Sequence, residues 1–134
     1  MELPFKDLTH RIIGSAMEVH RVLGPGFQEY IYQRVLAIEL MKADIKFQEE
    51  FELPIFYKGD KIGLRRVDFW IENKISLEIK ATSDIDNAQL AQGINYIEAA
   101  GIDAGLLINF GAPSLQFKRL FNKKTPNPNK DIFP

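Results

Sequence analysis

The spacing of apolar and polar residues predicts three helices in this chain. Apolar residues recur at three- and four-residue intervals over residues 9–23 and again over residues 27–42, and Gly24-Pro25-Gly26 separates the two segments. This pattern indicates two amphipathic helices joined by a sharp turn. A third helix is predicted over residues 85–100, and Gly101 ends it.

Between the second and third predicted helices, the pattern changes to that of β-strands. Residues 47–57 are rich in aromatic and aliphatic side chains, while apolar and polar side chains alternate over residues 62–71 and 75–81. Turn-forming residues occupy positions 58–60 and 72–74. We therefore expect an antiparallel meander of three strands.

A fourth strand is predicted after the third helix. Residues 103–110 are mostly apolar, as in a strand that is buried on both faces. Because a helix joins it to the meander, this strand should lie parallel to one of the other three. A short helix is predicted over residues 115–121. The expected fold is α/β (α+β), with a central mixed four-stranded sheet flanked by helices.

Composition limits the chemistry of the chain. Its 134 residues suit one domain, and the absence of cysteine excludes disulfides and cysteine-bound zinc. With only two histidines, a metal would be held mainly by oxygen, which favours Mg²⁺ or Mn²⁺. No signal-peptide pattern or membrane-length apolar run occurs, so we expect a cytoplasmic protein without a membrane partner.

The charge of the chain gives weaker evidence about nucleic-acid binding. The net charge of −1 argues against a protein that binds nucleic acid tightly and indiscriminately. Local basic clusters could still contact nucleic acid, although solvated surface charge explains them equally well; they are Lys61, Arg65 and Arg66, and Lys118, Arg119, Lys123 and Lys124. Residues 122–134, with three prolines, are expected to form a flexible C-terminal tail.

The second and third strands are predicted to bring two carboxylates together. If residues 72–74 form a three-residue hairpin loop, the apolar side chains share one face through the pairs Ile71 with Ile75, Phe69 with Leu77, and Val67 with Ile79. In this register Asp68 lies opposite Glu78, and Lys80 shares a face with Glu78. Facing carboxylates repel each other, so a divalent cation, a shared proton or the Lys80 ammonium must neutralise them.

This arrangement has the residue types that metal-assisted phosphodiester hydrolysis needs. Asp68 and Glu78, with the backbone carbonyl of Ile79, could hold a cation that activates a water molecule. Lys80 could orient or help deprotonate that water and offset charge on the phosphate. An ordinary lysine–carboxylate pair on an exposed sheet face is the competing interpretation.

Several motifs resemble a known family. Asp68 followed by Glu78-Ile79-Lys80 resembles the signature of the PD-(D/E)XK nuclease superfamily, although Val67 stands in place of the proline. Gly26-Phe27-Gln28-Glu29-Tyr30-Ile31-Tyr32 matches a Gly-x-x-Glu-x-x-Tyr motif, and residues 106–111 also resemble the small GxxExxY proteins of that superfamily. The resemblance covers residues 5–121 and implies a restriction endonuclease-like core.

The resemblance implies three further site residues. Glu29 corresponds to an N-terminal-helix acidic residue that supplies another metal ligand, although a surface glutamate that stabilises the helix dipole is the alternative. Gln92 and Tyr96 resemble a pair that RecB-type nucleases place beside the active site, and their i, i+4 spacing puts them on one helical face. An ordinary polar side of the helix, with no role in the site, would show the same spacing. His20 is expected to pack rather than bind metal, and no chemistry is assigned to Glu18.

The function that these residues favour is a Mg²⁺- or Mn²⁺-dependent nuclease acting on DNA. Because positive charge is sparse, the affinity for nucleic acid should be modest. This suggests that the protein acts as a homodimer or with a partner protein, or that its substrate is small or single-stranded. Two alternatives remain open: a non-catalytic binding or interaction module with the same fold, and a metal-dependent hydrolase of phosphorylated small molecules.

Overall fold

The structure is a computed structural model that describes residues 4–124. Within this range the elements follow the order α1 (Lys6–Leu23), α2 (Glu29–Lys42), β1 (Phe47–Tyr57), β2 (Asp60–Ile71), β3 (Ile75–Lys80), α3 (Asn87–Ala100), β4 (Ala104–Asn109) and β5 (Gln116–Phe121). Most of the predicted tail, residues 125–134, lies outside the described residues. Asn122 at its start donates its side-chain Nδ2 to the Ile102 carbonyl at 3.0 Å.

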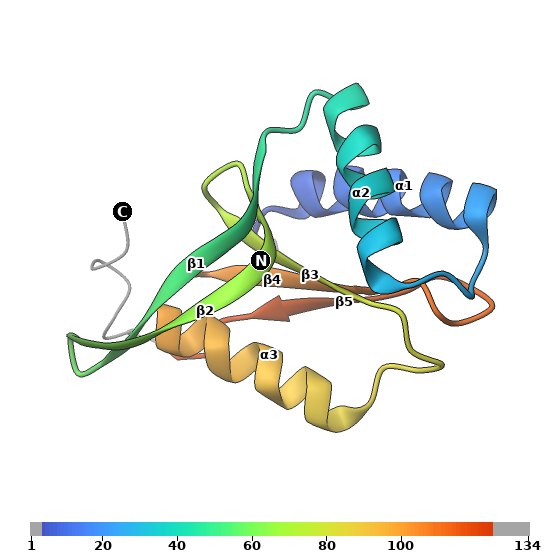
Figure 1. Cartoon of the computed structure of the whole chain (residues 1–134). Helices are drawn as coiled ribbons and strands as arrows, with labels where there is room; N and C mark the ends of the chain where they lie inside the picture. Colours follow the sequence, from blue (N-terminus) through green and yellow to red (C-terminus); the bar gives the residue numbers. More distant parts are fainter. Residues whose placement is uncertain (1–3, 125–134) are drawn as a thin grey trace.

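One mixed sheet lies between two helical layers (Figure 1). The strands of the described chain follow the order β1-β2-β3-β4-β5; β3 and β4 are parallel, and the other neighbours are antiparallel. Helices α1 and α2 cover one face, and α3, which connects β3 to β4, covers the other. The predicted α/β architecture, including the parallel fourth strand, is confirmed and is consistent with a restriction endonuclease-like fold.

The number of strands differs from the prediction. The sheet in residues 4–124 has five strands rather than four, because the predicted terminal helix over residues 115–121 is instead β5. Over so few residues, helical and alternating patterns look alike, and the pairing partner decides between them. Here β4 offers an open edge, and β5 pairs along its whole length, from Ala104 with Phe121 to Asn109 with Gln116.

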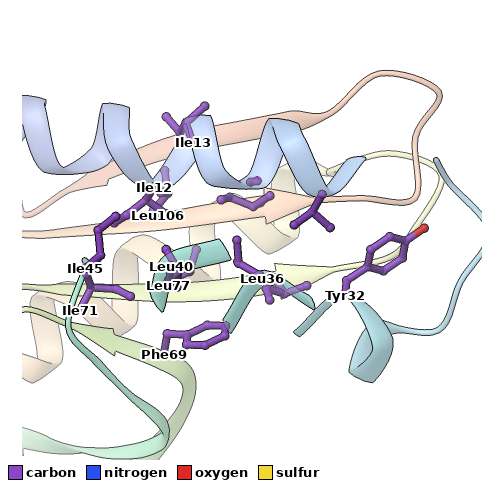
Figure 2. Close-up of a cluster of buried hydrophobic side chains, with 14 of the residues drawn as sticks. Ile12, Ile13, Tyr32, Leu36, Leu40, Ile45, Phe69, Ile71, Leu77 and Leu106 are labelled. Atoms are coloured by element: carbon purple, nitrogen blue, oxygen red, sulfur yellow. The ribbon is translucent and has the colours of Figure 1, made fainter. Parts of the chain in front are cut away.

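Each face of the sheet packs against its own hydrophobic cluster. Figure 2 shows the cluster under α1 and α2, where Tyr32, Leu36 and Leu40 of α2 lie against the sheet. The side chains that β2, β3 and β4 contribute to it include Phe69, Ile71, Leu77 and Leu106. The opposite cluster, under α3, contains Leu53, Val67, Trp70, Ile97 and Leu107 among its buried residues.

Strand β2 departs from strict alternation at Asp68. Phe69 and Ile71 face α1 and α2 as predicted, but Val67 packs in the cluster under α3. The prediction that Val67 shares a face with Phe69 and Ile79 is therefore wrong. In the neighbouring strand, Glu50 has a φ of 52°, a conformation that most residues avoid, and the regular pairing of β1 with β2 omits Glu50 and Asp68. The two strands thus change the faces of their side chains at this point.

Candidate active site

Asp68 lies where β2 and β3 separate. Two of the three predicted hairpin pairs are confirmed, Phe69 with Leu77 and Ile71 with Ile75, whereas the regular pairing of β2 with β3 does not extend to Val67 with Ile79 or to Asp68 with Glu78. Beyond the confirmed pairs, the Ile79 N–H donates a hydrogen bond to Oδ2 of the Asp68 carboxylate at 2.7 Å, in place of a backbone carbonyl of β2. A half-buried acid is thereby fixed to the strand that carries Glu78 and Lys80.

The partner of Glu78 is Arg65, a residue that the sequence had placed only in a surface cluster. Arg65 Nη2 donates to Glu78 Oε2 at 2.7 Å, and both side chains are mostly buried. If side chains alternated strictly along β2, Arg66 and not Arg65 would share a face of the sheet with Asp68. Because β2 breaks this alternation at Asp68, Arg65 and Val67 both face α3, where Glu78 lies. The sequence analysis therefore identified Arg65 as a basic residue near the site but could not show which face of the sheet it occupies.

Electrostatic interactions join Asp68 to its neighbours. Burial raises the pKa of the Asp68 carboxyl above its usual range, and the hydrogen bond from Ile79 N–H opposes this shift. Glu78 raises the same pKa further, while Lys80 and Arg65 lower it. The Asp68 carboxyl is therefore near enough to Glu78, Lys80 and Arg65 to interact with all three charges, while burial is the main cause of its raised pKa.

Glu29 approaches the same place from α2. It occupies the first turn of the helix, and its pKa is raised mainly by burial and next by the Asp68 carboxylate, while Lys80 lowers it and Glu78 raises it. The side chain nevertheless stays largely exposed to solvent. Glu29 therefore lies at the open rim of the group that Asp68, Glu78 and Lys80 form.

Tyr32 explains how α2 is positioned. Its ring is fully buried and stacks on Phe110 at a centroid separation of 4.7 Å, while its hydroxyl donates to the Gly24 carbonyl at 2.5 Å and accepts from the Phe27 N–H at 3.2 Å. Figure 2 shows this hydroxyl pointing away from the cluster. Tyr32 thus ties down the turn that leads directly to Glu29.

Gln92 and Tyr96 face the site from α3. Together with Arg65, Glu78 and Lys80 they line a pocket between α3 and the sheet. The enclosed part measures about 20 Å³, which is room for about one water molecule. The structure therefore brings both helical residues beside the strand residues, on the side where Glu78 meets Arg65.

Two further residues of the N-terminal motif, His20 and Glu18, make contacts outside the carboxylate group. His20 contacts the Ala112 carbonyl through Nε2 at 2.9 Å and lies against Phe110, in agreement with the predicted packing role. Glu18 forms an exposed ion pair with Arg21 at 2.7 Å. Neither side chain is part of the carboxylate group.

Sequence reasoning did not assign a role to Asn109, which organises the chain after Lys80. This amide is fully buried and bonds Thr82 through both its oxygen and its nitrogen, at 2.9 Å each. Its oxygen also accepts from Gly111 N–H, and its nitrogen donates to Gln116. A side chain at Gly111 would collide with the Thr82 carbonyl oxygen, so glycine allows this close approach.

The donor chemistry of the site fits a hard divalent cation. Three carboxylates interact, and the pKa values of Glu29 and Asp68 are raised first by burial and also by the neighbouring carboxylates, so a bound cation would favour their charged forms. Within residues 4–124, however, no three histidine, cysteine, aspartate or glutamate side chains are grouped closely enough to hold a metal ion together. The pairing of Glu78 with Arg65 is consistent with this result, because it gives one of the carboxylates another partner.

The raised pKa of Asp68 predicts a stabilising substitution. An ionised carboxyl whose pKa is raised on folding opposes folding, and this cost grows as the pH rises from about 4 through the folded-state pKa. In the metal-free protein at pH 7, Asp68→Asn should therefore raise the midpoint of thermal unfolding, while the amide oxygen still accepts from Ile79 N–H. Melting curves in EDTA from pH 4 to pH 8 measure the effect.

Asp7→Asn is the matched control for this experiment because Asp7 is exposed in the first turn of α1. It should not show the increasing difference from the wild type between pH 4 and pH 7. A wild-type protein more stable than Asp68→Asn at pH 7 would show that the ionised carboxylate is adequately neutralised.

Comparison with known proteins assigns the chain to a family. The family model described as the PD-(D/E)XK nuclease superfamily matches residues 6–120, and the chain therefore belongs to that superfamily. No curated protein and no solved structure gave a match. Within the described residues, no helix is long and apolar enough to cross a membrane.

Proposed function

We propose that this protein is a metal-dependent nuclease that hydrolyses phosphodiester bonds of DNA, and that it belongs to the GxxExxY branch of its superfamily. The observation that carries the proposal is the hydrogen bond from Ile79 N–H to Asp68 Oδ2, which fixes Asp68 to the strand of Glu78 and Lys80, while Glu29 of α2 lies near enough to interact with all three. Superfamily membership supplies the reaction class, and nucleases of this superfamily typically depend on divalent metal.

Each residue has a defined part in this proposal. Asp68, Glu78 and the backbone carbonyl of Ile79 would hold Mg²⁺ or Mn²⁺, and Glu29 would contribute from the rim. A cation bound there would supply Lewis acidity and would balance negative charge on the phosphate. The Lys80 ammonium orients the attacking water, while Gln92 and Tyr96 contact the substrate from α3.

The charge of the protein favours a substrate that is bound without extensive phosphate contact. At a net charge of −1, tight binding along a long duplex lacks the lysine and arginine residues that it requires. The proposed substrates are therefore single-stranded or structurally distinctive DNA, with a second copy of the chain or a partner protein adding affinity where needed.

Cleavage assays with Mg²⁺ or Mn²⁺ test this function. Linear, nicked, branched and single-stranded DNA, and RNA, should be compared with and without EDTA. At least one DNA should be cut only with metal, and Asp68→Ala should abolish the cut. Metal at 100 times its Kd should also stabilise the wild-type protein against unfolding by about 2.7 kcal/mol, and Asp68→Ala should remove this gain.

A non-catalytic binding module is the second candidate. The ion pair between Arg65 and Glu78 favours it, because a carboxylate that is already neutralised has less need of a cation. Under this alternative, calorimetric titration would show Mn²⁺ binding that Asp68→Ala removes, while no nucleic acid in the panel is cut with any metal. Cleavage that disappears in both Glu78→Ala and Lys80→Ala would exclude the module.

A further inference from the structure

Arg65 joins three elements at the candidate site. It extends from β2, donates through Nη2 to Glu78 Oε2 of β3 at 2.7 Å, and places its guanidinium 4.5 Å from the centroid of the Tyr96 ring of α3. Both contacts stabilise a guanidinium in this position, the first by opposite charge and the second by a cation–π interaction. Arg65 is therefore held beside the pocket independently of any single partner.

Most of the hydrogen-bonding capacity of Arg65 is unused. A guanidinium carries five N–H donors in a rigid fork, and Glu78 is its hydrogen-bond acceptor among the described residues. Nε is buried and has no acceptor within residues 4–124. The side chain still retains 26% of its accessible surface and lines the pocket with Glu78, Lys80 and Gln92. Donors therefore remain available at a place that an oxyanion can reach.

Glu78 cannot serve Arg65 and a divalent cation equally well. An ion pair this short neutralises the carboxylate, and a guanidinium next to a divalent cation would be repelled by it. Binding of a cation by Glu78 should therefore weaken or displace the contact with Arg65. Tyr96 would still hold the guanidinium near the site, since the ring contact does not depend on the charge of Glu78.

We propose that Arg65 exchanges partners: it holds Glu78 when no cation is bound, and it binds a phosphate of the nucleic acid when a cation takes Glu78. The planar fork of arginine matches two phosphate oxygens, as it matches a carboxylate. The exchange rests on the proposed function, because it assumes that metal and phosphate meet at this site. Arg65 is then a substrate-binding residue and also a competitor for the metal.

The first test measures metal affinity without substrate. Arg65→Met removes the cation that competes for Glu78 while retaining an unbranched apolar side chain in place of the arginine stem. Mn²⁺ should therefore bind about three- to tenfold more tightly than to the wild type in calorimetric titration. Arg66→Met is the matched control, because Arg66 is exposed and pairs with Glu50 at the surface, and it should leave Mn²⁺ affinity unchanged. Arg65→Gln replaces Arg65→Met if the latter does not fold.

The second test measures nucleic-acid affinity in EDTA, where no cleavage is expected. Glu78→Gln removes the negative charge that holds Arg65, so a fluorescein-labelled single-stranded oligonucleotide should bind about three- to tenfold more tightly in anisotropy titrations. The gain should disappear in the double variant Glu78→Gln/Arg65→Met. It should persist in Glu78→Gln/Arg66→Met, because Arg66 lies outside the contact.

The outcomes separate this inference from the proposed function. Mn²⁺ affinity that falls or stays constant in folded Arg65 variants overturns the exchange, as does an oligonucleotide gain that survives loss of Arg65. A wild-type protein that binds no Mn²⁺ overturns both proposals. Failure of the wild type to cut any nucleic acid, combined with the expected Mn²⁺ and oligonucleotide results, overturns the nuclease function while supporting the exchange.

Discussion

Replacement of Lys80 by alanine is expected to lower kcat for metal-dependent cleavage by about 10²- to 10⁴-fold, with little loss of Mn²⁺ binding. The Lys80 ammonium interacts with the Asp68 and Glu29 carboxylates and forms no ion pair within residues 4–124. It is therefore free to orient a water molecule. Single-turnover cleavage of the best DNA substrate and calorimetric titration of Mn²⁺ measure the two quantities separately.

Lys74→Ala provides the control for this substitution. Lys74 is an exposed residue in the turn between β2 and β3, on the same hairpin as Lys80 but at its other end. Its loss should change kcat by less than about twofold. A Lys80→Ala protein that retains a tenth or more of the wild-type rate would remove Lys80 from the proposed mechanism, whatever its metal affinity.

The second large effect is expected on stability. Asn109→Leu should lower the free energy of unfolding by about 2 to 4 kcal/mol. The amide makes four hydrogen bonds from a fully buried position, and leucine would leave the Thr82 N–H and carbonyl without these partners. Urea unfolding followed by circular dichroism measures the change, and the slope of free energy with urea should remain near that of the wild type.

Asn95→Ala is a suitable control because Asn95 is exposed on α3. Its effect should stay within about 0.5 kcal/mol. If Asn109→Leu costs less than about 1 kcal/mol, the chain after Lys80 must be fixed mainly by contacts other than this amide. In that case cleavage activity should also survive the substitution.

The sequence predicted the hairpin of the site because its pattern was strict. Alternation over residues 75–81 and a turn of three residues leave one register that buries the apolar side chains, and the pairs Ile71 with Ile75 and Phe69 with Leu77 confirm it. The three strands of the predicted meander and all three helices were likewise recognisable from the spacing of their apolar residues. For these elements the local pattern was sufficient.

The errors have a common physical origin in partners that are distant in sequence. Val67 was assigned to the wrong face, and Arg65 was not connected with the site, because the irregularity at Asp68 and Glu50 arises between two strands and cannot be seen in the pattern of either strand alone. β5 was mistaken for a helix because the edge of β4 determines its conformation. The partner of Glu78 could not be predicted until these faces were known.

The position of strand β1 at the edge of the sheet bears on aggregation. It is an outer strand of the sheet in the described chain, and such strands can recruit a strand from another molecule and begin aggregation. Three exposed glutamates and Pro54, which has no N–H, lie along β1, and Glu50 interrupts its regular path; the glutamates are Glu49, Glu50 and Glu52. Negative charge, a missing donor and a bend all disfavour strand addition, so this margin of the sheet resists fibril-like association.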